Sequence, residues 1–531
     1  MTNFARAAAA ALFVFSLACE AQTAKRYMVA AAHPLAAEAG AEVLKRGGSA
    51  VDAAIAVQMV LGLVEPESSG IGGGAFLLHW SAAEKKLRTY DGRETAPAAA
   101  RPDRFLDLQK KPLSFLEAAV GGRSVGVPGV LRMLELAHQR HGRLPWNELF
   151  VAAIRIAEEG FAPSPKLREA LERERFLRED PAARKLYYSG SRIVNREYAD
   201  TLRVIARGGV SAFYEGDLAK DIALAVRTHA KPGDLTEDDL RNYRAVEREP
   251  VCGPYRRWRL CSMGPPSSGG VAVLQILGLL ERTSFARAPP ESAAALHLFA
   301  EAGKLAYADR ARYLGDPAFV PVPVNALLSS GYLDKRARLI GERAMSLAPP
   351  GDAEAGTSHF SIVDARGDIV AMTTTIESAF GSRIMVRGFL LNNQLTDFDF
   401  APGGPNSVAP GKRPRSSMSP TLVFQGTQVQ MALGSPGGSM IINYVAKALV
   451  ATLDWGLDVQ SALELPNFGS RNGPTLIEQG SRYEAFAAPL LELGHQVDKI
   501  PLTSGLHGIE RMPGGWRGGA DPRREGAVRG E

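Results

Sequence analysis

The stretch GTSHFSIVDARGDIVAMTTTI, from Gly356 to Ile376, constrains the fold of this chain more than any other. Apolar and β-branched residues on both sides of DARGD predict two antiparallel strands, Thr357–Val363 and Ile369–Ile376, joined by a tight turn. Symmetric pairing about the turn sets Thr357 opposite Thr375, so that the two hydroxyl groups can meet on one face of the sheet. We therefore expect a central hairpin with a threonine pair at its open end.

The first threonine of this hairpin has a feature that suits it to catalysis. A threonine hydroxyl is a poor nucleophile unless a base removes its proton, and the α-amine of an N-terminal threonine can act as that base. A free α-amine has a pKa of about 8, close to working pH. The preceding segment, SLAPPGDAEAG, is polar and rich in proline and glycine, as exposed and cleavable loops are. We therefore predict cleavage of the bond between Gly356 and Thr357.

Composition limits the classes of protein to which the chain can belong. Of its 531 residues, 45% are hydrophobic and 22% are charged, as in globular proteins. The 62 basic and 57 acidic residues nearly cancel, and no basic run carries interleaved aromatic residues, so we expect no nucleic-acid partner. Three cysteines and nine histidines without metal-site spacing favour no metal and no cofactor. Cys252 and Cys261 flank a predicted short hairpin, and both a disulfide and two unpaired cysteines stay open.

The first 21 residues differ from the rest of the chain. One arginine precedes the apolar stretch AAAAALFVFSLA, which is too short to span a bilayer but suits a secretory signal. We therefore predict that residues 1–21 are a signal peptide and that the mature protein is periplasmic or secreted. A lipid anchor on Cys19 is an alternative, although Ser16 fits a lipoprotein motif poorly.

The remaining chain shows a change from helical to strand-like sequence and back. Helical spacing over residues 33–64, broken by a glycine pair, predicts two helices, and residues 294–313 predict one long amphipathic helix. Residues 357–434 are strand-like, and a helical pattern returns at 439–456. We interpret this order as an α+β fold with sheet packed on sheet in the middle.

Several sequence blocks occur in the order that is typical of the γ-glutamyltranspeptidase (glutathione hydrolase) family. They include GGSAVDAAIA, EPESSGIGGGAFLL, DGRETAP, PPSSGG, KLAYADRARYLGDP, TSHFSIVD, LLNNQLTDF, KRPRSSMSPT, GSPGG and ADPRREG. The chain resembles this family, whose members are N-terminal-nucleophile hydrolases, over nearly its whole length after the signal. The resemblance implies an αββα fold that is formed jointly by a large subunit, 22–356, and a small subunit, 357–531. These would form a heterodimer that transfers γ-glutamyl groups from donors such as glutathione to water, amino acids or peptides.

The same resemblance assigns roles to individual residues. Thr357 is the nucleophile, and Thr375 is the hydroxyl partner that orients it. The backbone N–H groups of Gly437 and Gly438 form the oxyanion hole. The residues that the resemblance assigns to substrate binding are Arg93, Glu377, Gln394, Asp397, Ser416 and Ser417. Among these, the planar guanidinium of the arginine suits the α-carboxylate of the substrate, and the aspartate suits its α-ammonium.

The sequence departs from the family pattern at two places. Glu377 stands where many relatives have asparagine, and we interpret it as a contact to the substrate α-amine. Only the segment FDFAPGGPNSVAPGKRPR separates Asp397 from Ser416. Relatives with a lid over the pocket have a longer segment here, so we expect a lidless site that is open to bulkier γ-glutamyl compounds.

The motifs also bear on other interpretations of the chain. A related acylase acting on glutaryl or cephalosporin amides, or an enzyme of poly-γ-glutamate, keeps the fold, but Arg93 and Asp397 together favour a substrate with both an α-carboxylate and an α-amine. An uncleaved, non-catalytic homologue is disfavoured because Thr357 and Thr375 are both present. The glycine cluster at 70–74 does not predict a dinucleotide site, since a strand follows it rather than precedes it.

Overall fold

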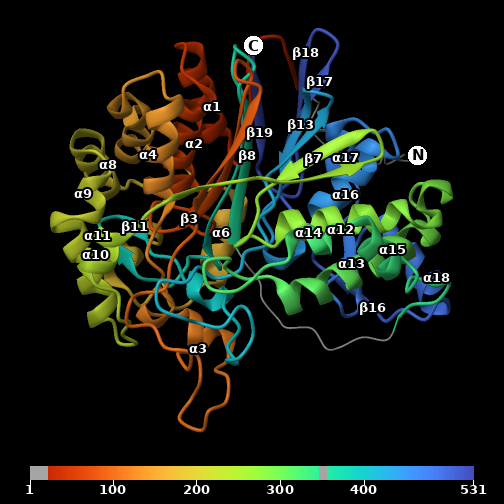
Figure 1. Ribbon diagram of the computed structural model, residues 1–531. Coiled ribbons are helices and arrows are strands. Elements are labelled where there is room, and N and C mark those ends of the chain that lie inside the picture. Colours follow the sequence, from red (N-terminus) through yellow and green to blue (C-terminus); the bar gives the residue numbers. More distant parts are fainter. Residues whose placement is uncertain (1–21, 346–355) are drawn as a thin grey trace, which may run out of the picture.

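The computed structural model describes residues 22–345 and 356–531, and it consists of two sheets between two layers of helices (Figure 1). The predicted signal peptide, Cys19 and most of the loop before Gly356 lie outside the described residues. The αββα architecture and the α+β class expected from the sequence are confirmed.

The first sheet has the strand order β19-β2-β8-β9-β3-β4-β5. Its strands are β19 (Ala527–Gly530), β2 (Met28–Ala31), β8 (Gly356–Val363), β9 (Ile369–Glu377), β3 (Gly74–Ser81), β4 (Lys86–Gly92) and β5 (Val246–Arg248). The hairpin predicted from the sequence is β8 and β9, and it occupies the centre of this sheet.

The second sheet has the order β1-β18-β17-β13-β12-β7-β6. Its strands are β1 (Gln22–Ala24), β18 (Gly515–Ala520), β17 (His507–Met512), β13 (Gln428–Gly434), β12 (Thr421–Gln425), β7 (Trp258–Ser262) and β6 (Val251–Tyr255). Smaller sheets are formed by β10 (Met385–Val386) with β11 (Phe389–Leu390), and by β14 (Phe468–Ser470), β15 (Thr475–Glu478) and β16 (Val497–Ile500). Both large sheets contain strands from before and strands from after Gly356.

The helices are divided between the two sides of this sandwich (Figure 1). Those of the first half are α1 (Pro34–Lys45), α2 (Ala50–Val64), α3 (Phe115–Ala119), α4 (Val130–His141), α5 (Val151–Glu159), α6 (Pro165–Arg173), α7 (Pro181–Tyr187), α8 (Arg196–Gly208), α9 (Ser211–Tyr214), α10 (Gly216–Thr228) and α11 (Glu237–Asn242). Those on the side of the second sheet are α12 (Gly269–Glu281), α13 (Ala293–Tyr313), α14 (Val324–Leu327), α15 (Ser330–Ala337), α16 (Ile441–Leu453), α17 (Val459–Glu464) and α18 (Ala487–Glu492).

The two helices predicted over residues 33–64 are α1 and α2, and the turn between them explains the glycine pair. Gly47 has a φ of +87°, a conformation that glycine adopts without strain. Ser49 then caps α2 by accepting a hydrogen bond from the N–H of Asp52, whose carboxylate accepts one from the N–H of Ser49. The long helix predicted at 294–313 is α13, and the helical pattern at 439–456 contains α16.

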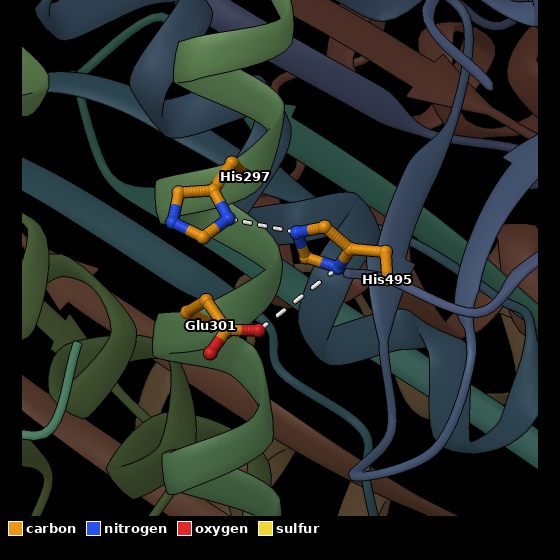
Figure 2. A group of neighbouring side chains, drawn as sticks. All are labelled: His297, Glu301 and His495. Atoms are coloured by element: carbon orange, nitrogen blue, oxygen red, sulfur yellow. Dashed lines mark hydrogen bonds and ion pairs between the residues drawn. The ribbon is translucent and has the colours of Figure 1, made fainter. Parts of the chain in front are cut away.

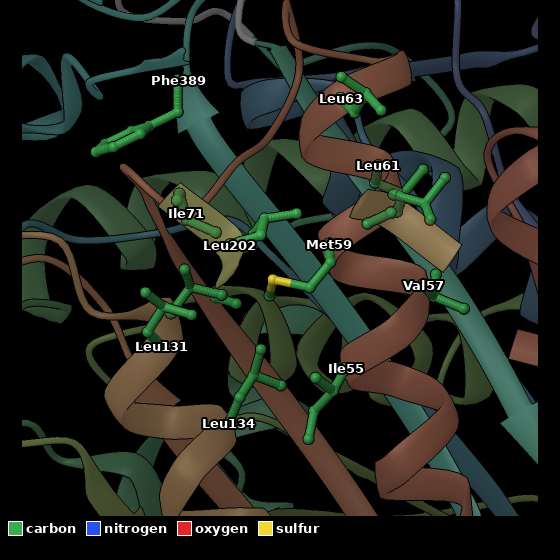
Figure 3. Close-up of a cluster of buried hydrophobic side chains, with 14 of the residues drawn as sticks. Ile55, Val57, Met59, Leu61, Leu63, Ile71, Leu131, Leu134, Leu202 and Phe389 are labelled. Atoms are coloured by element: carbon green, nitrogen blue, oxygen red, sulfur yellow. The ribbon is translucent and has the colours of Figure 1, made fainter. Parts of the chain in front are cut away.

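Alternation along the strands divides the buried side chains between two cores. In β2, Val29 and Ala31 face the helices of the first layer, whereas Met28 and Ala30 face the second sheet. The first core surrounds α2, which is buried on nearly every side and carries apolar residues all around (Figure 3). The second core fills the space between the sheets and beneath α12, α13 and α16.

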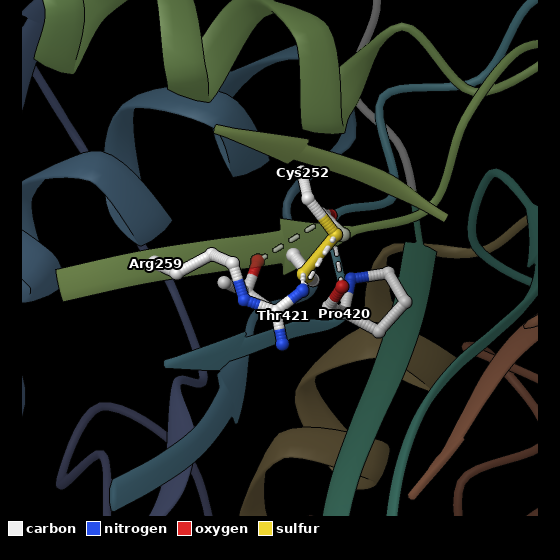
Figure 4. The surroundings of a disulfide bond; sticks show 6 residues. Cys252, Arg259, Pro420 and Thr421 are labelled. Carbon is white, nitrogen blue, oxygen red and sulfur yellow. Dashed lines mark hydrogen bonds between the residues drawn. A yellow bond between two sulfur atoms is a disulfide. The ribbon is translucent and has the colours of Figure 1, made fainter. Parts of the chain in front are cut away.

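Cys252 and Cys261 form a disulfide between β6 and β7 (Figure 4). The two residues are direct partners in this antiparallel pair, with Cα atoms 4.1 Å apart. The hairpin predicted at this position is confirmed, and the question of bridging, which the sequence left open, is answered in favour of a bridge.

The burial of α2 predicts a large effect of truncating one of its side chains. Leu61 is fully buried, so Leu61→Ala should lower the free energy of unfolding by about 2–5 kcal/mol because it removes buried methyl groups and leaves a cavity. The matched control is Leu224→Ala in α10, where the side chain is 55% exposed and the expected change is below about 1 kcal/mol. Thermal unfolding followed by circular dichroism compares the two variants, and equal midpoints would contradict the description of this core.

Candidate active site

A cavity of 640 Å³ lies at the head of β8, and most of the residues singled out in the sequence line it. The residues that the structure brings together there include Thr357, Thr375, Gly438, Arg93, Glu377, Gln394, Asp397, Ser416 and Ser417. Gly437 is the exception among the predicted site residues, since it adjoins the cavity wall rather than lining it. These residues come from distant parts of the chain, and β8, β9 and the segment 394–417 carry most of them.

The two threonine hydroxyl groups meet, although the strand register differs from the prediction. The pairing holds from Val363 with Ile369 as far as Ser358 with Thr374, but Gly356 then pairs with Glu377. Between these pairs β9 carries one residue more than β8, which is a β-bulge. Direct opposition of the two threonines is therefore wrong, because symmetric pairing allows no extra residue. The Thr357 hydroxyl still lies 3.4 Å from the Thr375 hydroxyl oxygen.

The bulge also fixes the residues around Thr375. Its hydroxyl oxygen accepts a hydrogen bond of 2.8 Å from the N–H of Glu377. Glu377 has a φ of +82°, which is rare for a residue with a side chain and indicates local strain. The backbone thus turns sharply at Glu377 and directs its side chain into the cavity.

A buried ionic network holds the start of β8 from behind. The Ser358 hydroxyl donates a 2.7 Å hydrogen bond to Glu65, which pairs with the Lys166 ammonium at 2.9 Å. Burial opposes ionisation of Glu65, but Lys166 and Arg524 hold its pKa below the usual value. Arg524 also donates to the carbonyl oxygen of Thr357 at 3.2 Å. Side chains from three distant segments therefore fix the position of Thr357.

At one end of the cavity, an arginine and an aspartate form a pair. Arg93 Nη2 donates to Asp397 Oδ2 at 2.5 Å, and the Gln394 amide donates to the same oxygen at 2.7 Å. Arg93 is 1% exposed and also donates to the carbonyl oxygen of Pro414, whereas Asp397 is 31% exposed. The aspartate is thus the accessible member of the pair, and the hydrogen bond from the buried arginine fixes its position.

The carboxyl group of Glu377 lies near this pair, and its pKa is raised. Burial, followed by the negative charge of Asp397, raises the pKa of Glu377 to about 8. The Asn393 amide donates to its carboxyl group at 2.5 Å. At neutral pH the carboxyl group of Glu377 is therefore largely protonated.

Ser416 and Ser417 lie opposite, close to a buried arginine that the sequence analysis did not single out. Arg310 donates to the Ser417 hydroxyl at 2.9 Å and to the Ser268 hydroxyl at 2.8 Å. Burial, followed by the charge of Arg415, lowers the pKa of Arg310 to about 9. The block KLAYADRARYLGDP contains Arg310, so a signal existed, but nothing in the sequence placed that helix beside the two serines.

The glycine pair of GSPGG shapes the cavity wall where β13 leads into a 3₁₀ turn, Gly438–Met440, and then α16. Gly437 and Gly438 have φ values of +125° and +55°. A Cβ atom on Gly437 would lie 2.5 Å from the ring of Tyr444, so only glycine fits. Backbone N–H groups at the start of a helix favour negative charge, which suits an oxyanion.

Outside the cavity, two histidines and a glutamate come together in a way that their spacing did not predict (Figure 2). His297 Nε2 donates to the Gly341 carbonyl oxygen, so its Nδ1 accepts from His495 Nε2 at 2.7 Å. Burial lowers the pKa of His495 to about 3 and keeps it neutral. The Lys304 ammonium forms an ion pair with Glu301 at 2.6 Å. Two of the groups that could ligate a metal, the imidazoles, thus hydrogen-bond to each other, and the third is paired with a lysine.

Comparison with known proteins agrees with this geometry. Residues 36–531 match the family described as Gamma-glutamyltranspeptidase. The glutathione hydrolase proenzyme of Bacillus subtilis (strain 168) is 37% identical over 534 residues, covering 94% of this chain and 91% of that protein. The acylase ACY 1 proenzyme of Pseudomonas sp. (strain V22) is 36% identical, covering 96% and 94%. The crystal structure of cephalosporin acylase from Bacillus halodurans matches with a TM-score of 0.87 at 30% identity, covering 98% of each chain.

The sandwich of two sheets between helices, with a threonine at the head of a central strand facing a polar cavity, defines the class of N-terminal-nucleophile hydrolases. Within that class, the chain belongs to the γ-glutamyltranspeptidase family. The resemblance inferred from the sequence blocks is confirmed.

The raised pKa of Glu377 predicts a pH dependence of substrate binding. Because the carboxyl group ionises as pH rises through about 8, a substrate ammonium should gain a second carboxylate partner above that pH. We expect the KM for a γ-glutamyl donor to fall by about fivefold to tenfold between pH 7 and pH 9 relative to Glu377→Gln, in which this group cannot ionise. Initial rates measured between pH 7 and pH 9 give the KM of each protein. Parallel KM profiles in the wild-type protein and the variant would contradict this role of Glu377.

Proposed function

We propose that this protein is a self-processing γ-glutamyl hydrolase and transferase that uses Thr357 as its nucleophile. Cleavage before Thr357 would yield a large subunit, 22–356, and a small subunit, 357–531, after removal of residues 1–21. The observation that carries the proposal is the contact between the Thr357 and Thr375 hydroxyl groups inside a cavity that holds an accessible aspartate. The names of the relatives, glutathione hydrolase proenzymes among them, support processing and suggest glutathione as a donor.

Self-cleavage would use the same hydroxyl as turnover. Thr357 Oγ1 attacks the carbonyl carbon of Gly356, and the peptide nitrogen leaves as the α-amine of Thr357 while it takes up a proton. Water then hydrolyses the resulting ester, which restores the hydroxyl and leaves a carboxylate on Gly356. The network around Glu65 and Arg524 supports this step because it fixes the strand on which the hydroxyl must turn back.

In turnover, the free α-amine accepts the Thr357 hydroxyl proton as the oxygen attacks the γ-carbonyl carbon of the donor. The N–H groups of Gly437 and Gly438 would stabilise the oxyanion. The C–N bond then breaks, and the leaving amine takes the proton from the α-amine. Water or an acceptor amine attacks the γ-glutamyl ester, gives up its proton through the same base, and releases glutamate or a new γ-glutamyl compound. Every proton is thus returned, and no cofactor is required.

The head group of the donor would bind where the cavity is most polar. Asp397 and, at higher pH, Glu377 offer carboxylates to the α-ammonium. Arg93 and the hydroxyl groups of Ser416 and Ser417 would hold the α-carboxylate, and Gln394 orients Asp397. The acylase relatives suggest glutaryl or cephalosporin amides as alternative substrates. A glutaryl group has no α-ammonium, so these carboxylates favour γ-glutamyl donors over such amides.

Two features of the chain support export of the protein from the cytoplasm. Residues 1–21 have the composition of a secretory signal, and the disulfide between Cys252 and Cys261 suits an oxidising compartment. In the described part of the chain, no helix has both the length and the apolar character needed to cross a bilayer. We propose a periplasmic or secreted protein.

Replacing the nucleophile should abolish both reactions. Thr357→Ala removes the hydroxyl that attacks Gly356, so a denaturing gel should show one uncut band and γ-glutamyl p-nitroanilide should not be hydrolysed. Thr427→Ala, in the exposed turn between β12 and β13, is the matched control and should be processed normally. A fully processed Thr357→Ala protein would refute the assignment.

The role of Asp397 predicts a change in donor preference. Asp397→Asn keeps the shape of the side chain but removes the negative charge that faces an α-ammonium. We expect kcat/KM for γ-glutamyl p-nitroanilide to fall by about tenfold to a hundredfold, as for loss of a charge-assisted hydrogen bond. Activity on glutaryl p-nitroanilide, which lacks the amine, should change much less. Equal losses on the two donors would count against this role.

A further inference from the structure

Arg471 lines the active-site cavity, and neither the sequence motifs nor the proposed mechanism gives it a role. It follows β14 in a tight turn whose next residue, Asn472, has a φ of +66°. The Ser470 hydroxyl donates to the Gly473 carbonyl oxygen at 2.9 Å and closes this turn. Arg471 Nη1 donates to the Ser439 hydroxyl oxygen at 2.8 Å. The guanidinium is therefore held in a fixed place, one residue beyond Gly438.

Arg471 differs in its partners from Arg93 and Arg415, which also line the cavity. Arg310, a third cavity arginine, likewise forms no ion pair with a carboxylate among the described residues, but its guanidinium donates to Ser268 and Ser417. Arg93 pairs with Asp397, and Arg415 pairs with Asp399 at 3.2 Å. Over residues 22–345 and 356–531, no carboxylate forms an ion pair with Arg471, and its buried Nε has no hydrogen-bond partner. A guanidinium offers parallel donors that match a carboxylate, so a partly buried one without an acidic partner is suited to bind a carboxylate from outside the protein.

The position of Arg471 along the cavity identifies which part of a substrate it would meet. Arg310 lies near Tyr307, with its guanidinium 5.9 Å from the centroid of the tyrosine ring, and the charge of Asp397 also acts on it. Tyr307 donates to the Ser439 carbonyl oxygen, next to the residue that Arg471 contacts. A γ-carbonyl held between Thr357 and Gly438 places the glutamyl chain toward the head-group residues Arg93 and Asp397. The leaving amine would then extend the other way, along the cavity wall that Ser439 and Arg471 form.

We propose that Arg471 binds a carboxylate on the leaving group of the donor, and on the acceptor when the reaction runs in the transfer direction. This proposal rests on the γ-glutamyl activity proposed above and specifies its substrates. Preferred donors are γ-glutamyl amino acids and short peptides with a free carboxylate. Uncharged γ-glutamyl amides and anilides lack this contact, and they bind through the head group alone.

A pair of donors that differ in one group tests the proposal. γ-Glutamylglycine and γ-glutamylglycinamide share the scissile bond, and only the first carries a carboxylate. We expect the wild-type protein to favour the first by about tenfold to a hundredfold in kcat/KM, the range for a charge-assisted hydrogen bond. Arg471→Gln should lose most of that preference, with less than about a threefold change on the amide. Arg471→Lys, which keeps the charge without the planar fork, should retain an intermediate preference.

Control measurements separate the possible causes of a change. Arg482→Gln, in the same part of the chain, removes an exposed arginine that pairs with Glu291 and should leave both donors unaffected. Processing into two bands shows that each variant folds. Equal losses on both donors in Arg471→Gln would assign the arginine a structural role through Ser439, and a wild-type protein without donor preference would also overturn the proposal. Failure of the wild-type protein on γ-glutamyl p-nitroanilide as well would instead refute the γ-glutamyl activity itself.

Discussion

The antiparallel pairing of β8 and β9 is the interaction on which the rest of the structure depends. These strands are the centre of the first sheet, so their inward faces contact the second sheet and their outward faces contact α2. The same pairing ends in the bulge that brings two hydroxyl groups together and turns Glu377 into the cavity. A regular ladder would continue the sheet smoothly. The interruption instead places the Thr357 and Thr375 hydroxyl groups beside the cavity, as the proposed mechanism requires.

Burial shifts the pKa values of several charged groups in the cavity. Arg93 is 1% exposed and pairs with Asp397, which is the more exposed partner. Glu377 and Arg310 are both pushed toward their neutral forms by burial and by a like charge nearby, Asp397 in the first case and Arg415 in the second. These shifts weaken the repulsion between like charges that lie close together in the cavity.

The sequence predicted the parts of this structure that depend on local patterns. Periodicity identified the hairpin, the helix pair at 33–64 and α13, and the ordered sequence blocks identified the family and most of the cavity residues. The bulge was missed because symmetric pairing is the simplest register, and nothing local signals an extra residue near Thr375. Arg310 and Arg471 were missed for another reason. Their importance comes from contacts with Ser417 and Ser439, and such long-range contacts exist only once the chain has folded.

Each large sheet combines strands from before Gly356 with strands from after it, so the two segments of the chain are joined by backbone hydrogen bonds. β8 lies between β2 and β9, and β12 lies between β7 and β13, so a break ahead of Thr357 cuts the chain without separating neighbouring strands. The two polypeptides would remain interlocked through their backbone hydrogen bonds. Pulling them apart would expose open sheet edges and both apolar cores, so dissociation would amount to denaturation. On this topology, a cut ahead of Thr357 would leave the two segments held in the same two sheets.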